Sequence, residues 1–132
     1  MQHIVTILIA ILIFCIIVVI HEFGHFIAAK LNRIQVNQFA VGMGPKLLHF
    51  QKGETEYSLR LFPVGGFCAM EGEDQSSDNP NAFEKKPVWR RMTVILAGPF
   101  MNLVLGFLLI VILLCTAQKV PSLTIARFAE TT

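Results

Sequence analysis

Residues 4–20 read IVTILIAILIFCIIVVI, and the stretch HEFGH follows at once at residues 21–25. The apolar run contains no charged residue. Its length is close to the roughly 20 residues that a helix needs to cross the hydrocarbon core of a bilayer. The residues after it can continue the helix to about Lys30. We therefore predict a transmembrane helix over about residues 4–30 that carries HEFGH near its end.

A second run, residues 94–116, is also free of charge, and it predicts a second transmembrane helix. The whole chain is 54% hydrophobic and only 15% charged, well below the charged fraction of soluble domains. The predicted fold class is an α-helical membrane protein with a small antiparallel β-sheet between its two helices. A cleaved signal peptide is the alternative for the first run. It would need a basic start and a small-residue cleavage site, and neither is present.

The basic residues predict the orientation in the membrane. Most of the eleven Lys and Arg residues lie between the two apolar runs: Lys30, Arg33, Lys46, Lys52, Arg60, Lys85, Lys86, Arg90 and Arg91. The positive-inside rule then places residues 31–93 in the cytoplasm and both ends of the chain outside. A net charge of +2, spread along the chain, does not favour nucleic acid as a partner.

The stretch between the helices has the period of β-structure. Residues 57–61 alternate apolar and polar side chains, and residues 34–41 and 46–51 are rich in β-branched and aromatic types. With a short stretch ending at Met70, they predict an antiparallel sheet of three or four strands over about 34–70. This sheet could offer an edge to an extended peptide, or it could simply cover the helix ends.

The residues that lead to the second helix are polar and then amphipathic. Residues 71–82 are acidic and rich in turn-forming residues, which predicts a mobile loop. Residues 83–93 place Trp89 beside Arg90, a combination typical of a membrane interface, and we interpret them as an interfacial anchor.

HEFGH matches the pattern HExxH. Positions i and i+4 share one face of a helix, so His21 and His25 can ligate one Zn²⁺ ion. Glu22 would lie beside a bound water and act as the general base. The alternative is a polar cap where the helix leaves the bilayer, but polar groups within a membrane span are costly and usually functional. His3 and His49 are interpreted as a solvated and a structural side chain.

The three cysteines show no CxxC pair, so we expect reduced thiols. In the second helix, Gly98, Asn102 and Gly106 follow one another at intervals of four residues and form one stripe. Such a stripe could pack against another helix, or it could present the Asn102 amide to a substrate backbone. Spacing alone favours helix packing.

Several motifs in order resemble the site-2 protease family of intramembrane zinc metalloproteases, in particular its bacterial regulator of sigma-E protease branch. Besides HEFGH, they are FAVGMGP at 39–45, LFPVGGF at 61–67, KPVWRR at 86–91 and AGPFMN at 97–102. The resemblance implies cleavage within or near a transmembrane segment of a membrane-anchored protein, such as an anti-sigma factor or a remnant signal peptide. It also implies Zn²⁺ as cofactor, the bacterial inner membrane as location, and Asn102, Gly65 and Gly66 as substrate-binding residues.

The same resemblance predicts the domain organisation. Residues 1–118 would be the N-terminal part of the protease domain, and 119–132 an extracytoplasmic linker at the approach to a PDZ domain. The third zinc ligand of the family is an Asp in a later transmembrane helix, a segment that this sequence does not contain. The acidic residues at 71–78 could replace it only if their loop folded back. We therefore expect a fragment that is inactive without the rest of its own chain.

Two other classes remain open at this point. One is a non-catalytic two-helix membrane protein whose histidines pack or bind metal structurally. The other is a soluble metalloprotease, which the charge-free runs disfavour.

Overall fold

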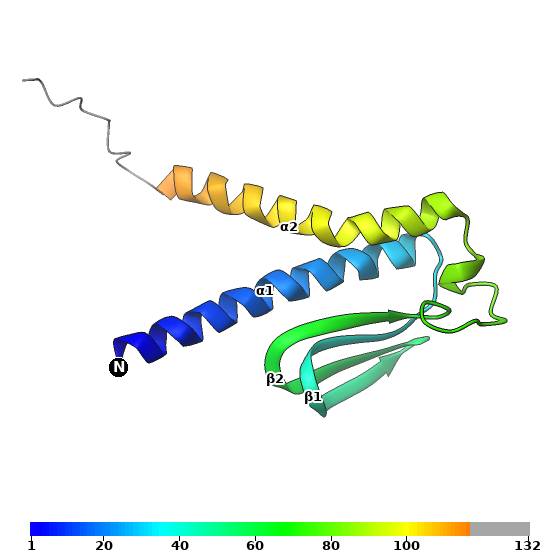
Figure 1. Cartoon of the computed structure of the whole chain (residues 1–132), viewed down its shortest axis with the longest axis horizontal. Coiled ribbons are helices and arrows are strands. Elements are labelled where there is room, and N and C mark those ends of the chain that lie inside the picture. Colours follow the sequence, from blue (N-terminus) through cyan, green and yellow to red (C-terminus); the bar gives the residue numbers. More distant parts are fainter. Residues whose placement is uncertain (117–132) are drawn as a thin grey trace, which may run out of the picture.

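Two long helices and one β-hairpin make up the described part of the chain (Figure 1). The computed structural model describes residues 1–116, so the linker expected at 119–132 lies outside the described residues. The elements are α1 (Gln2–Leu31), β1 (Val36–Lys52), β2 (Thr55–Met70), the short 3-10 helix η1 (Phe83–Lys85) and α2 (Val88–Thr116). The C-terminal part of α1 contacts α2, and the two helices diverge from there, while the sheet lies along one side of α1 (Figure 1).

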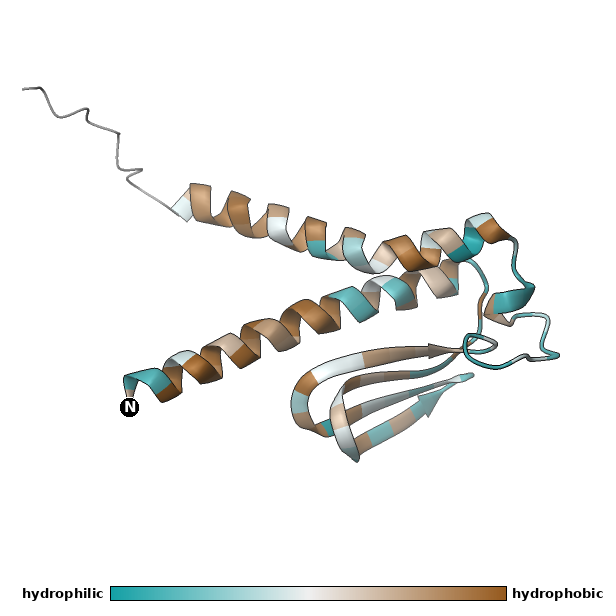
Figure 2. Ribbon diagram, viewed as in Figure 1, coloured by the Kyte–Doolittle hydropathy of each residue, from teal (hydrophilic) through white to brown (hydrophobic). Residues whose placement is uncertain are grey.

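Both helices are long and apolar enough to cross a membrane. Only 6% of the most apolar window of each helix is buried within the structure, which argues against the core helix of a soluble protein. Figure 2 shows that apolar residues prevail along most of both helices. The second helix begins at Val88, earlier than the sequence predicts, so the expected anchor at 83–93 is divided between η1 and the first turns of α2.

The crossing of α1 and α2 depends on a small residue. A Cβ atom added at the buried Gly24 would lie 2.4 Å from the carbonyl oxygen of Ala97 and 2.8 Å from Cγ of Met101. Only a residue without a side chain permits this approach of the two backbones, as is common where membrane helices cross. Gly24 therefore fixes the distance between the helix that carries HEFGH and its neighbour.

The sheet consists of two long bent strands and not of the three or four separate strands that the sequence predicts. Residues 36–41 of β1 pair with 66–70 on one side, and residues 38–41 pair with 56–59 on the other. Residues 46–52 pair with 55–60. The hairpin thus doubles back on itself, with its bends at glycines. Gly42 and Gly65 have φ of 84° and 78°, a left-handed conformation that other residues rarely adopt.

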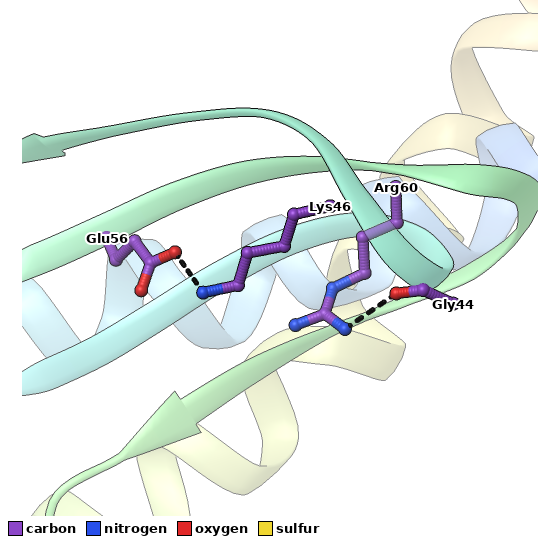
Figure 3. Close-up of polar contacts among 4 residues, drawn as sticks. All are labelled: Gly44, Lys46, Glu56 and Arg60. Carbon is purple, nitrogen blue, oxygen red and sulfur yellow. Dashed lines mark hydrogen bonds and ion pairs between the residues drawn. The ribbon is translucent and has the colours of Figure 1, made fainter.

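Side chains hold the bend of β1 in place. Arg60 of β2 donates a hydrogen bond from Nη1 to the carbonyl oxygen of Gly44 over 3.0 Å, and Lys46 forms an ion pair with Glu56 (Figure 3). The guanidinium of Arg60 also lies 4.8 Å from the centre of the Phe67 ring. The first two contacts join β1 to β2. The third joins the two ends of the bend within β2.

A small core lies where the C-terminal end of α1, the sheet and α2 meet. Its buried members are Ala29, Ile34, Val36, Cys68 and Val94. The buried hydroxyl of Thr55 donates to the carbonyl oxygen of Val36 over 2.7 Å, so a polar group inside this region is satisfied. This core fixes the sheet beside the end of α1 that carries the histidines.

The segment at 71–82 forms hydrogen bonds to residues 35 and 37 at the start of the sheet, although its composition predicts a mobile loop. The backbone N–H of Glu71 bonds to the carbonyl of Gln35, and the N–H of Gln35 bonds to the carbonyl of Asn81. The side chain of Asn79 donates to the Gln35 side chain, and Asn37 donates to Glu71. The same amide and carboxylate groups that make the sequence polar are used here to hold a turn.

Candidate metal centre

The two histidines of HEFGH come together on one face of α1. Their Nε2 atoms are 3.1 Å apart, the ring centres are 4.8 Å apart, and the rings are nearly perpendicular. Both side chains are half-buried. Two imidazole nitrogens bound to one tetrahedral zinc at about 2.0–2.1 Å would be separated by roughly 3.3 Å. The observed separation therefore suits two ligands of a single metal ion.

The opposite wall of this site is a glycine of α2. A Cβ atom added at Gly98 would lie 2.4 Å from Nε2 of His25 and 2.7 Å from Nε2 of His21. Gly98 therefore lies directly against both ring nitrogens, where any side chain at residue 98 would displace them. The donor set of two imidazoles fits a zinc ion.

A backbone carbonyl determines which nitrogen of the His25 ring carries the hydrogen. Nδ1 of His25 is 2.8 Å from the carbonyl oxygen of Val94. A carbonyl can only accept, so Nδ1 carries the hydrogen and the neutral ring keeps its lone pair on Nε2. Histidine ligands of metals are commonly oriented in this way by a hydrogen bond from the other ring nitrogen. The fully buried Val94 thus holds His25 in the form that binds a metal.

Glu22 lies next to the histidines, in a cavity of about 230 Å³. His25, Cys68 and Glu73 also line this cavity. Burial raises the pKa of the Cys68 thiol to about 12, and the charges of Glu22 and Glu73 add to the effect. Cys68 is therefore a neutral thiol at physiological pH in the metal-free protein. Glu22 is the half-buried carboxylate on α1 that is available to a water molecule in this cavity.

The described residues bring no third ligand to the two histidines. Within residues 1–116, no group of three or more His, Cys, Asp or Glu side chains is arranged to hold a metal ion. Glu71, one of the acidic residues considered as a substitute, accepts hydrogen bonds from Asn37 and Ser77. Glu73 reaches the cavity beside Glu22 without completing a ligand set.

Two members of the predicted stripe on α2 face the site, and the third does not. Nδ2 of Asn102 is 3.2 Å from Nδ1 of His21, and Oδ1 of the same amide is buried with no partner among the described residues. Gly98 faces both rings, whereas a Cβ at Gly106 would meet nothing within 4 Å. The stripe therefore contacts the histidines through Gly98 and Asn102, whereas Gly106 faces open space.

Gly65 and Gly66 lie at the bend of β2, away from the cavity that contains Glu22. A Cβ at Gly65 would meet the side chain of Met43, and one at Gly66 would lie 2.8 Å from the carbonyl oxygen of Ala40. Further along the same strand, Cys68 and Met70 line that cavity. The sequence did not indicate that Cys68, Met70 and Gly98 belong to the site. These residues reach it only because α2 and β2 pack against α1.

Comparison with known proteins identifies a family and several relatives. Residues 9–131 match the model of a family described as peptidase family M50. A Clostridium acetobutylicum protein named "Putative zinc metalloprotease" is 50% identical over 104 residues, which are 79% of this chain and 31% of that protein. A Clostridium perfringens protein with the same type of name is 48% identical over 105 residues, or 80% of this chain and 31% of the relative.

A plant protein is also similar. The chloroplastic membrane metalloprotease ARASP of Arabidopsis thaliana is 39% identical over 109 residues, which are 80% of this chain and 24% of that protein. The chain thus spans less than a third of the length of each of these three relatives.

Proposed function

The chain belongs to peptidase family M50, and from this premise we propose that it is the N-terminal catalytic part of a membrane-embedded zinc metalloendopeptidase. The observation that carries the proposal is the pair of Nε2 atoms, 3.1 Å apart and packed against Gly98, with Glu22 beside them on the same helix. Names of relatives that describe zinc metalloproteases and a membrane metalloprotease support both the metal and the location.

His21 and His25 would hold the zinc ion through Nε2. Zinc at this position would lower the pKa of a bound water and polarise the carbonyl of the scissile peptide bond. Glu22 takes the proton of the attacking water and passes it to the leaving amine, a general base role that is typically worth 10²–10⁴-fold in rate. Val94 keeps the ring of His25 in its metal-binding form throughout.

The third protein ligand of the enzyme would come from outside residues 1–116, since a catalytic zinc site normally has three. Activity would therefore depend on a further part of the same chain, and we expect residues 1–116 to be inactive alone. The linker and PDZ domain expected from residue 119 onward belong to the same proposal.

We place the substrate between the sheet and α2. Residues 66–70 form an outer segment of the sheet, paired with residues 36–41 on one side only, and Cys68 and Met70 of this segment line the cavity of Glu22. An extended peptide could add to such an edge by main-chain hydrogen bonds. Gly65 and Gly66 would set the bend that guides it, and the unpartnered end of the Asn102 amide would contact its backbone.

The substrate class of the proposal is the transmembrane segment of a membrane-anchored protein, such as an anti-sigma factor or a remnant signal peptide. The enzyme would lie in the bacterial inner membrane with residues 31–93 in the cytoplasm. The exposed Trp89, with the guanidinium of Arg90 5.1 Å from its ring centre, suits the interface at the start of α2.

The test compares two carboxylates of one cavity in the native full-length protein. Glu22→Gln should lower the rate of cleavage of a membrane-anchored substrate by about 10²–10⁴-fold while the protein keeps its zinc, because Gln cannot accept the proton. Glu73→Gln is the matched control, since Glu73 lines the same cavity. It should retain most of the activity, because Glu73 is neither the general base nor a metal ligand in this proposal. Equal activity of Glu22→Gln and wild type would remove Glu22 from the mechanism.

The metal assignment is tested separately by elemental analysis. His21→Ala and His25→Ala should each lose zinc, whereas His49→Ala, an exposed histidine on β1, should not. Full zinc content in the His21 and His25 variants would favour the alternative of a non-catalytic two-helix membrane protein with structural histidines.

A further inference from the structure

A line of hydrogen bonds runs from Asn102 through both histidines to Val94. Asn102 Nδ2 contacts Nδ1 of His21, the two Nε2 atoms are within hydrogen-bond distance of each other, and Nδ1 of His25 reaches the carbonyl of Val94. Because Val94 can only accept, Nε2 of a neutral His25 has no hydrogen. The hydrogen between the two Nε2 atoms must then belong to His21, and Nδ1 of His21 must accept from the Asn102 amide.

Binding of a metal ion requires the other tautomer of His21. A ligating Nε2 needs its lone pair free, so the hydrogen of the neutral ring must be on Nδ1. The neighbour of Nδ1 must then accept a hydrogen bond. His25 is already in the required form, which means that His21 alone must change when the site fills.

The carboxamide of Asn102 can serve both forms of His21. Rotation of the amide by half a turn exchanges its nitrogen and its oxygen, which occupy nearly equivalent positions. Nδ2 donates to Nδ1 of His21 in one orientation, and Oδ1 accepts from Nδ1–H in the other. The half-buried Asn102 projects from α2 one turn beyond Gly98 and contacts Nδ1 of His21, whereas Gly98 lies against Nε2 of the same ring.

We propose that Asn102 is a positioning residue for the metal centre: its Oδ1 accepts the Nδ1 hydrogen of His21 and keeps Nε2 of that ring free for zinc. The inference rests on the proposed function, because it needs His21 as a ligand. It differs from the contact with substrate proposed for the same residue, since here one end of the amide acts through His21 whether or not a substrate is bound.

The experiment measures zinc affinity, which a mere contact with substrate would not change. The native full-length protein in detergent is titrated with zinc against a competing chelator. Asn102→Leu keeps a similar volume but cannot accept a hydrogen bond, and it should bind zinc about 10–100-fold more weakly, the usual effect of losing such a partner. Asn102→Asp keeps an acceptor oxygen at the same position and should stay within a few-fold of wild type.

Asn32 provides a matched control between the same two helices. Its Nδ2 donates to the carbonyl of Ala28 and to the hydroxyl of Thr93 on α2, away from the histidines. Asn32→Leu should therefore lower the melting temperature without changing zinc affinity. Melting curves of all variants without zinc show whether the Asn102 variants remain folded.

Two results would overturn the inference: zinc affinity of Asn102→Leu equal to wild type, or equal weakening in Asn102→Leu and Asn102→Asp. His21→Ala separates these results from a failure of the proposed function. If His21→Ala loses zinc while Asn102→Leu keeps it, only the inference on Asn102 fails. If His21→Ala keeps its zinc, the proposed metal site itself is wrong.

Discussion

At the scale of single residues, the chemistry that we propose for this protein is concentrated on three positions of α1 and two of α2. The spacing within HEFGH predicts that His21 and His25 share a face, and their Nε2 atoms do converge. The spacing on α2 predicts a stripe that contains Gly98 and Asn102, but not which helix it faces. Tertiary packing decides that, and no local pattern in the sequence encodes it.

The close packing of Gly98 against both imidazoles leads to a prediction about metal binding. Gly98→Ala would place a methyl group within 2.7 Å of both Nε2 atoms. The imidazoles must then turn aside, and zinc binding should weaken on the order of 10–100-fold, as for other losses of ligand orientation. Elemental analysis and chelator competition measure this effect. Gly106→Ala on the same helix meets open space and should bind zinc like wild type; if Gly98→Ala does so too, the metal position inferred here is wrong.

At the scale of elements, the two helices could be predicted from their charge-free runs, but their crossing could not. The crossing depends on Gly24, which in the sequence is only a small residue within HEFGH. Likewise, the four β-rich stretches are visible in the sequence, whereas their union into two bent strands depends on pairing between residues far apart in the chain. The glycines at the bends indicate turns, and local sequence does not distinguish a turn from a bend within a strand.

The crossing gives a prediction about stability. In Gly24→Ala the added methyl group would lie 2.4 Å from a backbone oxygen, which cannot move aside as a flexible side chain can. We expect a loss of about 1–3 kcal/mol in the free energy of unfolding, typical of overpacking. Thermal unfolding of the purified protein in detergent measures the change. Ala28→Gly, also on α1, removes a methyl group and creates no clash, so its loss reports helix propensity together with the packing of that methyl group against the core. A Gly24→Ala variant as stable as wild type would contradict the close crossing.

The segment at 71–82 gives a prediction about pH. Hydrogen bonds from Asn37 and then Ser77 lower the pKa of Glu71 below its ordinary value of 4.5. Because the folded-state pKa is the lower one, the contribution of Glu71 to stability is present above pH 4.5. It is lost as the pH falls through the folded-state value. The melting temperatures of wild type and Glu71→Gln should differ at pH 7, and they should converge as the pH is lowered in steps below 4.5. A constant difference between them would show that the charge of Glu71 is not involved, and Glu54→Gln in the hairpin turn serves as control.

At the scale of the whole molecule, the sequence predicts a membrane protein with a β-segment between two helices, and the structure and the family membership agree. What the sequence could not predict is the small size of the shared core. Apart from the buried Cys15, the apolar residues of α1 before Ile17 and those of α2 after Phe107 are exposed. The buried cluster lies where α1, α2 and the sheet meet. Composition reports how much apolar surface a chain has, but not whether lipid or protein covers it.

The single crossing point also has a mechanical consequence. From Gly24 to the start of α1 the helix forms a lever arm of roughly 33 Å, at ~1.5 Å per residue. A rotation of about 10° around the crossing would sweep the far end of this arm through roughly 6 Å, by the geometry of a rigid rod. The imidazole pair sits next to the pivot, where the same rotation produces almost no displacement. A small change in the crossing angle at Gly24 would therefore move the far ends of the two helices apart and hardly displace His21 and His25.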